Sequence, residues 1–81
     1  MDLVLYHATW CPFCRAFLPA YRRLAPQGKD VVLDDENDPR WEGIDVVPTV
    51  IAYDGAKEVR RLVAKAGIGL GEEEFRGWLT S

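Results

Sequence analysis

Short apolar runs of strand length alternate along this chain with segments whose apolar residues recur at helical spacing. The apolar runs cover residues 3–6, 31–33 and 49–53. Runs of this kind, rich in β-branched and aromatic side chains, are typical of buried strands. Asp54-Gly55 follows the third run and is a strong hairpin signal, so residues 58–63 are expected to return as an antiparallel fourth strand.

Helical spacing begins at Phe13, and the first helix is expected to end near Ala25, where Pro26 and Gly28 stop it. The apolar positions of its predicted buried face are Ala16, Phe17, Ala20, Tyr21 and Leu24. Pro19 lies inside this helix and lacks the N–H that would bond the carbonyl of Arg15, so a kink is expected there.

Two further helices are predicted later in the chain. Pro39 suits the first position of a short helix that extends to about Gly43. At the end of the chain, three glutamates at 72–74 suit a helix N-terminus, and Phe75, Trp78 and Leu79 share one face. The predicted order is strand, helix, strand, helix, strand, strand, helix, which indicates an α/β fold in one domain spanning residues 1–81.

Composition and charge narrow the possible partners. The chain has 10 Lys and Arg against 13 Asp and Glu, and this formal charge of -3 provides no basic surface for nucleic acid or for an anionic membrane. Residues 1–6 have no positively charged leader pattern, and no apolar stretch reaches membrane length. We therefore predict a cytoplasmic, monomeric protein that binds neither nucleic acid nor membrane.

Both cysteines lie in one segment, Trp10-Cys11-Pro12-Phe13-Cys14, directly after the first predicted strand. A disulfide across three positions closes too small a loop to be a useful structural staple, so reactivity explains the pair better. If Pro12 opens the helix, Cys11 lies at its N-terminus, where unpaired N–H groups and the positive end of the dipole favour a thiolate. Thiolate is the form that attacks disulfides. Cys11 is therefore the predicted nucleophile, and Cys14 is the predicted resolving thiol one turn deeper.

Other interpretations of these residues are weaker. A tetrahedral zinc site needs four ligands, and the chain offers one histidine, His7, besides the cysteines. A metal or cluster bridged between two copies stays open as an alternative. A single histidine at a strand end is more often a packing residue than a proton donor, so His7 is not placed in the catalytic set.

This arrangement resembles the thioredoxin fold, the superfamily of thioredoxins and glutaredoxins. Residues 8–14 resemble the thioredoxin active-site segment, Pro19 matches the family's kinking proline, and Val47-Pro48-Thr49 matches its cis-proline segment. The resemblance covers nearly the whole chain. It implies a four-stranded mixed sheet (βαβαββα) flanked by three helices, with a cis Pro48 packed against the cysteine pair.

The resemblance also implies a function, a thiol–disulfide oxidoreductase that reduces or exchanges protein disulfides through a redox-active Cys11–Cys14 pair. No bound cofactor and no metal are required. The residues expected to bind the substrate are Trp10, Pro12, Phe13, Val47, Pro48 and Thr49.

Departures from the thioredoxin pattern leave the electron donor open. Leu5 stands where thioredoxins carry a buried acid, and Pro12-Phe13 between the cysteines resembles glutaredoxins. The Gly-Gly followed by Asp with which glutaredoxins bind glutathione is not visible in residues 66–70, which favours a flavoprotein of the thioredoxin-reductase type over glutathione. A glutathione-dependent glutaredoxin and a non-enzymatic binding or metal-binding module remain the alternatives.

Overall fold

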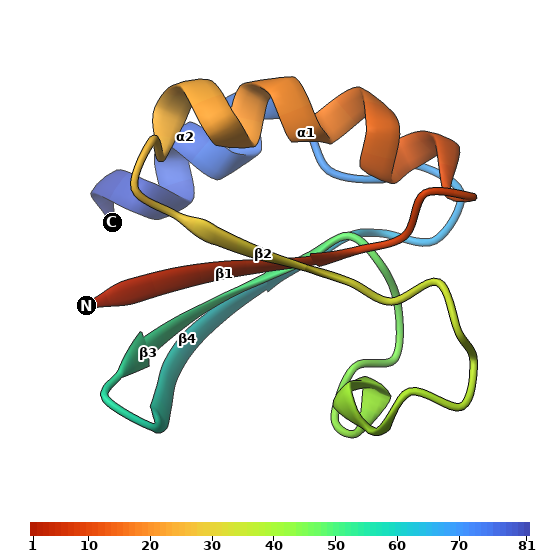
Figure 1. The fold of residues 1–81 in the computed structure, drawn as a ribbon. Helices are drawn as coiled ribbons and strands as arrows, with labels where there is room; N and C mark the ends of the chain where they lie inside the picture. Colours follow the sequence, from red (N-terminus) through yellow and green to blue (C-terminus); the bar gives the residue numbers. More distant parts are fainter.

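A single four-stranded sheet organises the computed structural model, which describes all of residues 1–81. Its strands are β1 (Asp2–His7), β2 (Lys29–Val32), β3 (Thr49–Asp54) and β4 (Lys57–Val63), in the spatial order β2-β1-β3-β4. β2 runs parallel to β1, whereas β3 is antiparallel to both β1 and β4. The predicted four-stranded mixed sheet is therefore confirmed (Figure 1).

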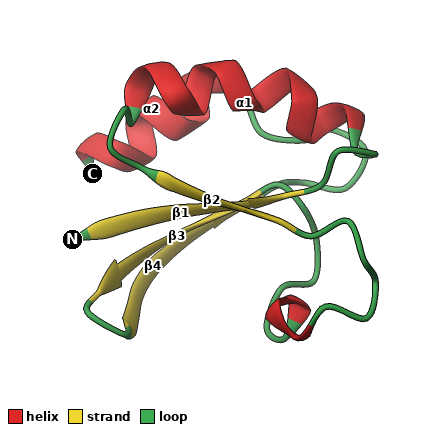
Figure 2. Cartoon of the chain, in the orientation of Figure 1, coloured by secondary structure: helices red, strands yellow, loops and turns green.

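Two α-helices, α1 (Pro12–Leu24) and α2 (Glu72–Thr80), lie together on one face of the sheet (Figure 1, Figure 2). The short helix predicted from Pro39 to about Gly43 forms as a single 3-10 turn, η1 (Pro39–Trp41), so the fold has two α-helices where three were predicted. Asp38 caps this turn by accepting the N–H of Arg40, but the chain leaves the helical conformation at Glu42 and reaches positive φ at Gly43. Neither helix is long and apolar enough to cross a membrane.

The helices bury an aromatic core against the sheet. The ring of Phe75 from α2 lies edge-on to Phe17 of α1, with centroids 5.3 Å apart, and also packs beside Tyr21. Leu5 of β1 and Val50 of β3 complete this core from the sheet side. Ala16, predicted for the buried face, is exposed instead, because the buried side of α1 is centred on the line through Cys14, Phe17 and Tyr21.

A second apolar cluster lies at the end of the sheet, beneath the segment that carries η1. It contains both cysteines together with Ala8, Leu33, Ile44, Val47 and Ile51. β2 was predicted to be buried and is instead an edge strand, because the strand order leaves it only one neighbour. Of the apolar run 31–33, Val32 is exposed and Leu33 is the residue that is fully buried. Leu33 lies just beyond the strand and belongs to the second cluster.

Candidate functional site

The nucleophile predicted from the sequence is the N-cap residue of α1. Cys11 has extended backbone angles, and its Sγ accepts the N–H of Cys14 at 3.2 Å, the position in which Ser or Asp oxygens usually cap helices. Pro12 follows at the first helical position, where its missing N–H costs no hydrogen bond. The residue that caps the helix is therefore also the residue that carries the candidate nucleophile.

Cys11 Sγ lies between a hydrogen-bond donor and a hydrogen-bond acceptor. The Cys14 N–H points at the sulfur at the positive end of the α1 dipole, which favours negative charge there, and no acidic residue lies in the first turn of the helix. On its other side the Cys11 thiol donates to the carbonyl oxygen of Val47, with Sγ and that oxygen 3.8 Å apart. The cysteine is 5% exposed, so the sulfur is reached only along a defined approach.

Cys14 lies in a different environment, one turn into α1. Its side chain is fully buried, and the two cysteines are free thiols in this structure. Burial, followed by the hydrogen bond with Cys11, raises the pKa of Cys14 to about 12. Cys14 is consequently a protonated thiol near neutral pH, while Cys11 is the sulfur that faces the surface.

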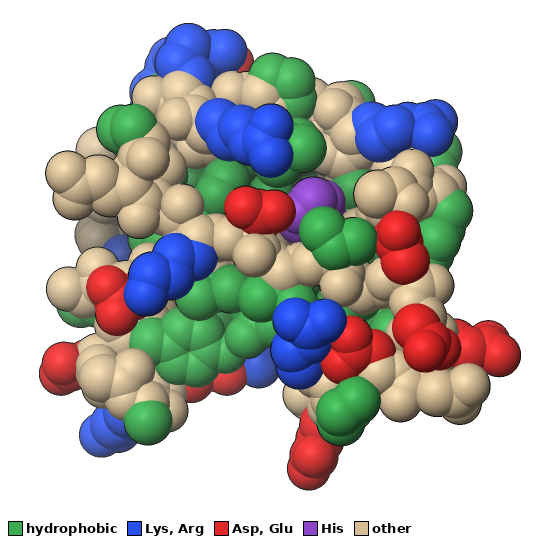
Figure 3. All heavy atoms as spheres, viewed as in Figure 1, with side chains coloured by type: hydrophobic (Ala, Val, Ile, Leu, Met, Phe, Trp, Pro, Cys, Tyr) green, Lys and Arg blue, Asp and Glu red, His purple; other side chains and the backbone are tan.

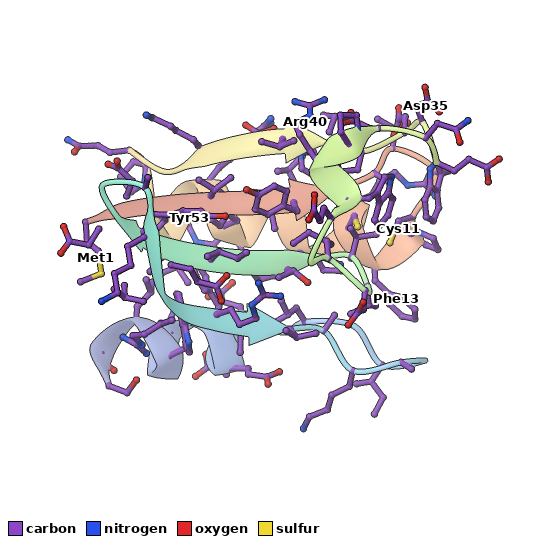
Figure 4. All side chains as sticks on the ribbon, turned by 90° about the horizontal axis from the view of Figure 1, so that it is seen from below. Met1, Cys11, Phe13, Asp35, Arg40 and Tyr53 are labelled. Carbon is purple, nitrogen blue, oxygen red and sulfur yellow. The ribbon has the colours of Figure 1, made fainter.

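A groove of about 340 Å³ opens beside Cys11. Its walls are Trp10, Cys11, Pro12, Phe13, Trp41, Asp45, Val46 and Val47. Figure 4 shows Cys11 and Phe13 at the end of the sheet, beside the segment that carries Arg40. Two of the walls are unusually exposed aromatic side chains, since Trp10 is 58% and Phe13 is 39% exposed. The structure thus gathers a largely apolar surface around the candidate nucleophile.

Four of the six predicted substrate-binding residues line this groove, and two lie behind it. The four are Trp10, Pro12, Phe13 and Val47. The peptide bond before Pro48 is cis, as the resemblance implies, but the ring itself is fully buried. Thr49 is 1% exposed, and its Oγ1 donates to the Val46 carbonyl at 2.6 Å. Pro48 and Thr49 therefore hold the wall in place and offer no surface of their own.

Sequence reasoning missed three residues of the groove: Trp41, Asp45 and Val46. Trp41 belongs to η1, and its Nε1 donates to the Asp35 carbonyl at 2.9 Å, which holds the half-buried indole against the second cluster. The available signal was a tryptophan in an otherwise polar segment, directly after a proline-initiated turn. Its place beside Cys11 depends on contacts between distant parts of the chain.

Gly69 leaves the space that the Phe13 ring occupies in the wall of the groove. It has φ +85°, and a Cβ at this position would lie 2.7 Å from Cδ1 of Phe13. A side chain here would displace the aromatic wall, so the absence of a Cβ lets the 66–70 loop approach the active-site turn.

The turn that leads into Cys11 is fastened by Asp34. The carboxylate accepts the Thr9 N–H at 2.7 Å and the Thr9 hydroxyl at 2.6 Å, and Arg15 donates to the Thr9 carbonyl at 3.3 Å. These bonds from Thr9 lower the pKa of Asp34. Asp34 thus connects the loop after β2 to the cysteine turn, a role that no local pattern in the acidic segment 34–38 indicates.

Two residues discussed from the sequence lie away from the sulfurs. His7 is 5% exposed and its Nε2 lies 2.8 Å from Oδ2 of Asp30, so it pairs with β2 and does not line the groove. Leu5 is fully buried in the aromatic core, so the position where thioredoxins carry an acid is apolar here. No group of three or more His, Cys, Asp or Glu side chains is arranged to hold a metal ion.

Comparisons with known proteins agree on the fold. No protein-family model matches the chain. The chain is 35% identical to a protein disulfide-isomerase of Saccharomyces cerevisiae over 69 residues, which are 75% of this chain. The match spans only 13% of the length of the yeast protein.

Thioredoxins are among the solved structures that are similar to this chain. One is a mutant thioredoxin from Halobacterium salinarum, with a TM-score of 0.70, 26% identity and coverage of 95% of this chain and 69% of that one. Thioredoxin 1 from Thermosipho africanus has a TM-score of 0.66 and 21% identity, covering 99% and 96% respectively. The spinach chloroplast thioredoxin f has a TM-score of 0.66 and 23% identity over 98% and 65%. The chain therefore has a thioredoxin-like fold.

The different environments of the two sulfurs predict selective alkylation. When the reduced, folded protein is treated with less than one equivalent of iodoacetamide near neutral pH, Cys11 should carry the label and Cys14 should stay free, because Cys14 is buried and protonated. Peptide mapping by mass spectrometry measures the ratio. In urea both sites should react alike, and equal labelling of the folded protein would contradict the assignment.

The Asp34 bonds predict an acid-dependent contribution to stability. A carboxyl whose pKa is lowered by folding stabilises the protein above its unfolded pKa and loses this effect as pH falls through the folded value. Asp34→Asn should therefore lower the urea midpoint at about pH 7, and the difference from wild type should shrink as the pH falls below the usual pKa of aspartate, about 4. Glu36→Gln, a neighbouring exposed acid without a hydrogen-bond partner, serves as the control. A difference that does not change with pH would argue against this role.

Proposed function

We propose that this domain is a thiol–disulfide oxidoreductase that reduces or exchanges disulfides of protein substrates. The observation that carries the proposal is the position of Cys11 Sγ, which caps α1 and at the same time borders an apolar groove. The yeast relative, named a protein disulfide-isomerase, supports the same class of reaction. Cys11 is the attacking residue and Cys14 is the resolving residue.

In the first step the Cys11 thiolate attacks one sulfur of the substrate disulfide. A bond forms between Cys11 and that sulfur, the substrate S–S bond breaks, and the second substrate sulfur leaves as a thiolate that takes a proton from water. The Cys14 N–H and the helix dipole stabilise the thiolate before the attack. The product is a mixed disulfide between Cys11 and the substrate.

In the second step Cys14 attacks the sulfur of Cys11. The Cys11–Cys14 disulfide forms, the mixed disulfide breaks, and the remaining substrate sulfur leaves as a thiolate. Cys14 must lose its proton in this step, and its raised pKa means that the proton is not released beforehand. With apolar Leu5 in place of a buried acid, the proton goes to the departing thiolate or to water.

The groove holds the peptide that carries the substrate disulfide. Trp10 and Phe13 offer flat apolar surfaces on the side of α1, and Val47 offers both its side chain and a carbonyl oxygen near the sulfur. Pro48 and Thr49 act through Val47 by fixing this wall. Trp41 adds an aromatic surface from η1.

The electron donor that returns the pair to dithiol is proposed to be a flavoprotein of the thioredoxin-reductase type. The 66–70 loop contributes Gly69 beneath Phe13 and has no Gly-Gly followed by Asp for glutathione. Reduction of disulfides suits the cytoplasm, where thiols are kept reduced, and this is the compartment predicted from the sequence.

Insulin reduction with dithiothreitol tests the two cysteine roles. Wild type should accelerate precipitation of the insulin B chain, and Cys11→Ser should be no faster than dithiothreitol alone, because the attacking sulfur is missing. When pre-reduced Cys14→Ser is mixed with insulin without dithiothreitol, which would cleave the adduct, it should form the mixed disulfide and fail to resolve it, so a covalent Cys11–substrate adduct should accumulate in the mass spectrum. Activity of Cys11→Ser equal to wild type, or a substrate adduct on Cys14 of the Cys11→Ser variant, would refute the proposal.

A further inference from the structure

The wall of the groove contains one charged residue, Asp45. It lies on the segment between η1 and the cis Pro48, two positions before Val47. Its side chain is exposed, and no cationic group lies within ion-pair distance of its carboxylate. An otherwise apolar groove beside the candidate nucleophile therefore carries one negative charge that forms no ion pair within the chain.

The arginines of the surrounding segments already have partners. Arg61 binds Glu58 at 2.6 Å and the Gly43 carbonyl at 2.8 Å, and although Asp45 contributes to its raised pKa, the bond to Glu58 is the larger cause. Arg40 binds Asp38 at 2.6 Å, and Arg15 donates to the Thr9 carbonyl. The Asp45 carboxylate is thus available for an ion pair with a cationic group of a bound substrate.

The segment around Asp45 adds to this negative charge. Residues 34–45 contain six acidic residues and one arginine. In Figure 3 acidic side chains gather on the part of the surface that this segment occupies in Figure 1. Since exposed charges act over about 10 Å at moderate salt, an approaching cation is attracted before contact. Asp45 is the acidic residue of this segment that lines the groove.

We propose that Asp45 determines specificity, by selecting disulfides whose flanking residue is Lys or Arg. Long basic side chains bury their aliphatic stems on apolar surfaces and keep the charge at the tip, and cations also bind well over indole rings. Trp10 and Trp41 supply the rings and Asp45 supplies the counter-charge. The inference rests on the proposed disulfide reduction and names its substrate class: basic peptide segments.

Single-turnover reduction of model peptides tests the selection. Three peptides, each closed by one internal disulfide, differ only in carrying Lys, Gln or Glu beside a cysteine, and each is mixed with pre-reduced wild-type protein without other reductant. We expect the Lys peptide to react faster than the Gln peptide by about 1.5- to 5-fold, the range of an exposed ion pair, and the Glu peptide to be slowest. The spread should narrow at high salt.

Substitutions of Asp45 test the effect of its charge on substrate preference separately from disulfide reduction itself. Asp45→Asn should reduce the ratio of the Lys to the Glu rate, and Asp45→Lys should invert it. Asp54→Asn removes an equivalent exposed charge at the β3–β4 turn and should leave the ratio unchanged. Equal wild-type rates for the three peptides, or an unaltered preference in Asp45→Lys, would overturn this inference while leaving disulfide reduction intact. If no peptide is reduced faster than by Cys11→Ser, the proposed function itself fails, and the inference with it.

Discussion

The hydrogen bond from the Cys14 N–H to Cys11 Sγ is the interaction on which this structure most depends. It serves as the N-cap of α1 and as the stabilising contact of the candidate nucleophile, so folding of the helix and preparation of the sulfur cannot be separated. The buried face of α1 then places Phe17 and Tyr21 in the aromatic core, which fixes the helix on the sheet. The packing of α1 in the domain therefore fixes the position of Cys11 Sγ.

The strand order explains why the rest of the site gathers around this cap. β1 is a central strand with β2 on one side and β3 on the other, and the cysteine turn follows its carboxyl end. The loop that leaves β2 and the loop that enters β3 both meet this end of the sheet. The first supplies Asp34, which holds Thr9, and the second supplies Val47, which faces Cys11. In open α/β sheets, crevices form at such points.

The parts of the molecule that were predicted from the sequence are those with local signals. Apolar runs located β1 and β3, Asp54-Gly55 located the hairpin, and the cysteine spacing with Pro12 located the start of α1. The cis Pro48 followed from the family resemblance and not from the residues alone. All of these depend on neighbours in the chain or on a motif that can be recognised.

The parts that were not predicted depend on contacts between distant segments. The edge position of β2 follows from the sheet order, and η1 stays a single turn because the chain leaves the helical conformation at Glu42. The role of Asp34 could not be predicted, because its hydrogen-bond partner Thr9 lies 25 residues away in the sequence. Trp41 and Asp45 reach the groove only because the segment after β2 folds back toward the cysteine turn, which no local pattern encodes.

The central claim is that Cys11 and Cys14 form one reversible redox pair, with a reactive outer sulfur and a protected inner one. The most direct measurement equilibrates the protein in buffers of graded reduced-to-oxidised glutathione ratio, followed by acid quenching, thiol labelling and mass spectrometry. The account predicts a single step in which both thiols disappear together, the protein loses two hydrogens and carries no lasting glutathione, and reduced glutathione in excess reverses it. Two thiols that stay free at every ratio, or a stable glutathione adduct on Cys11 that Cys14 never resolves, would contradict it.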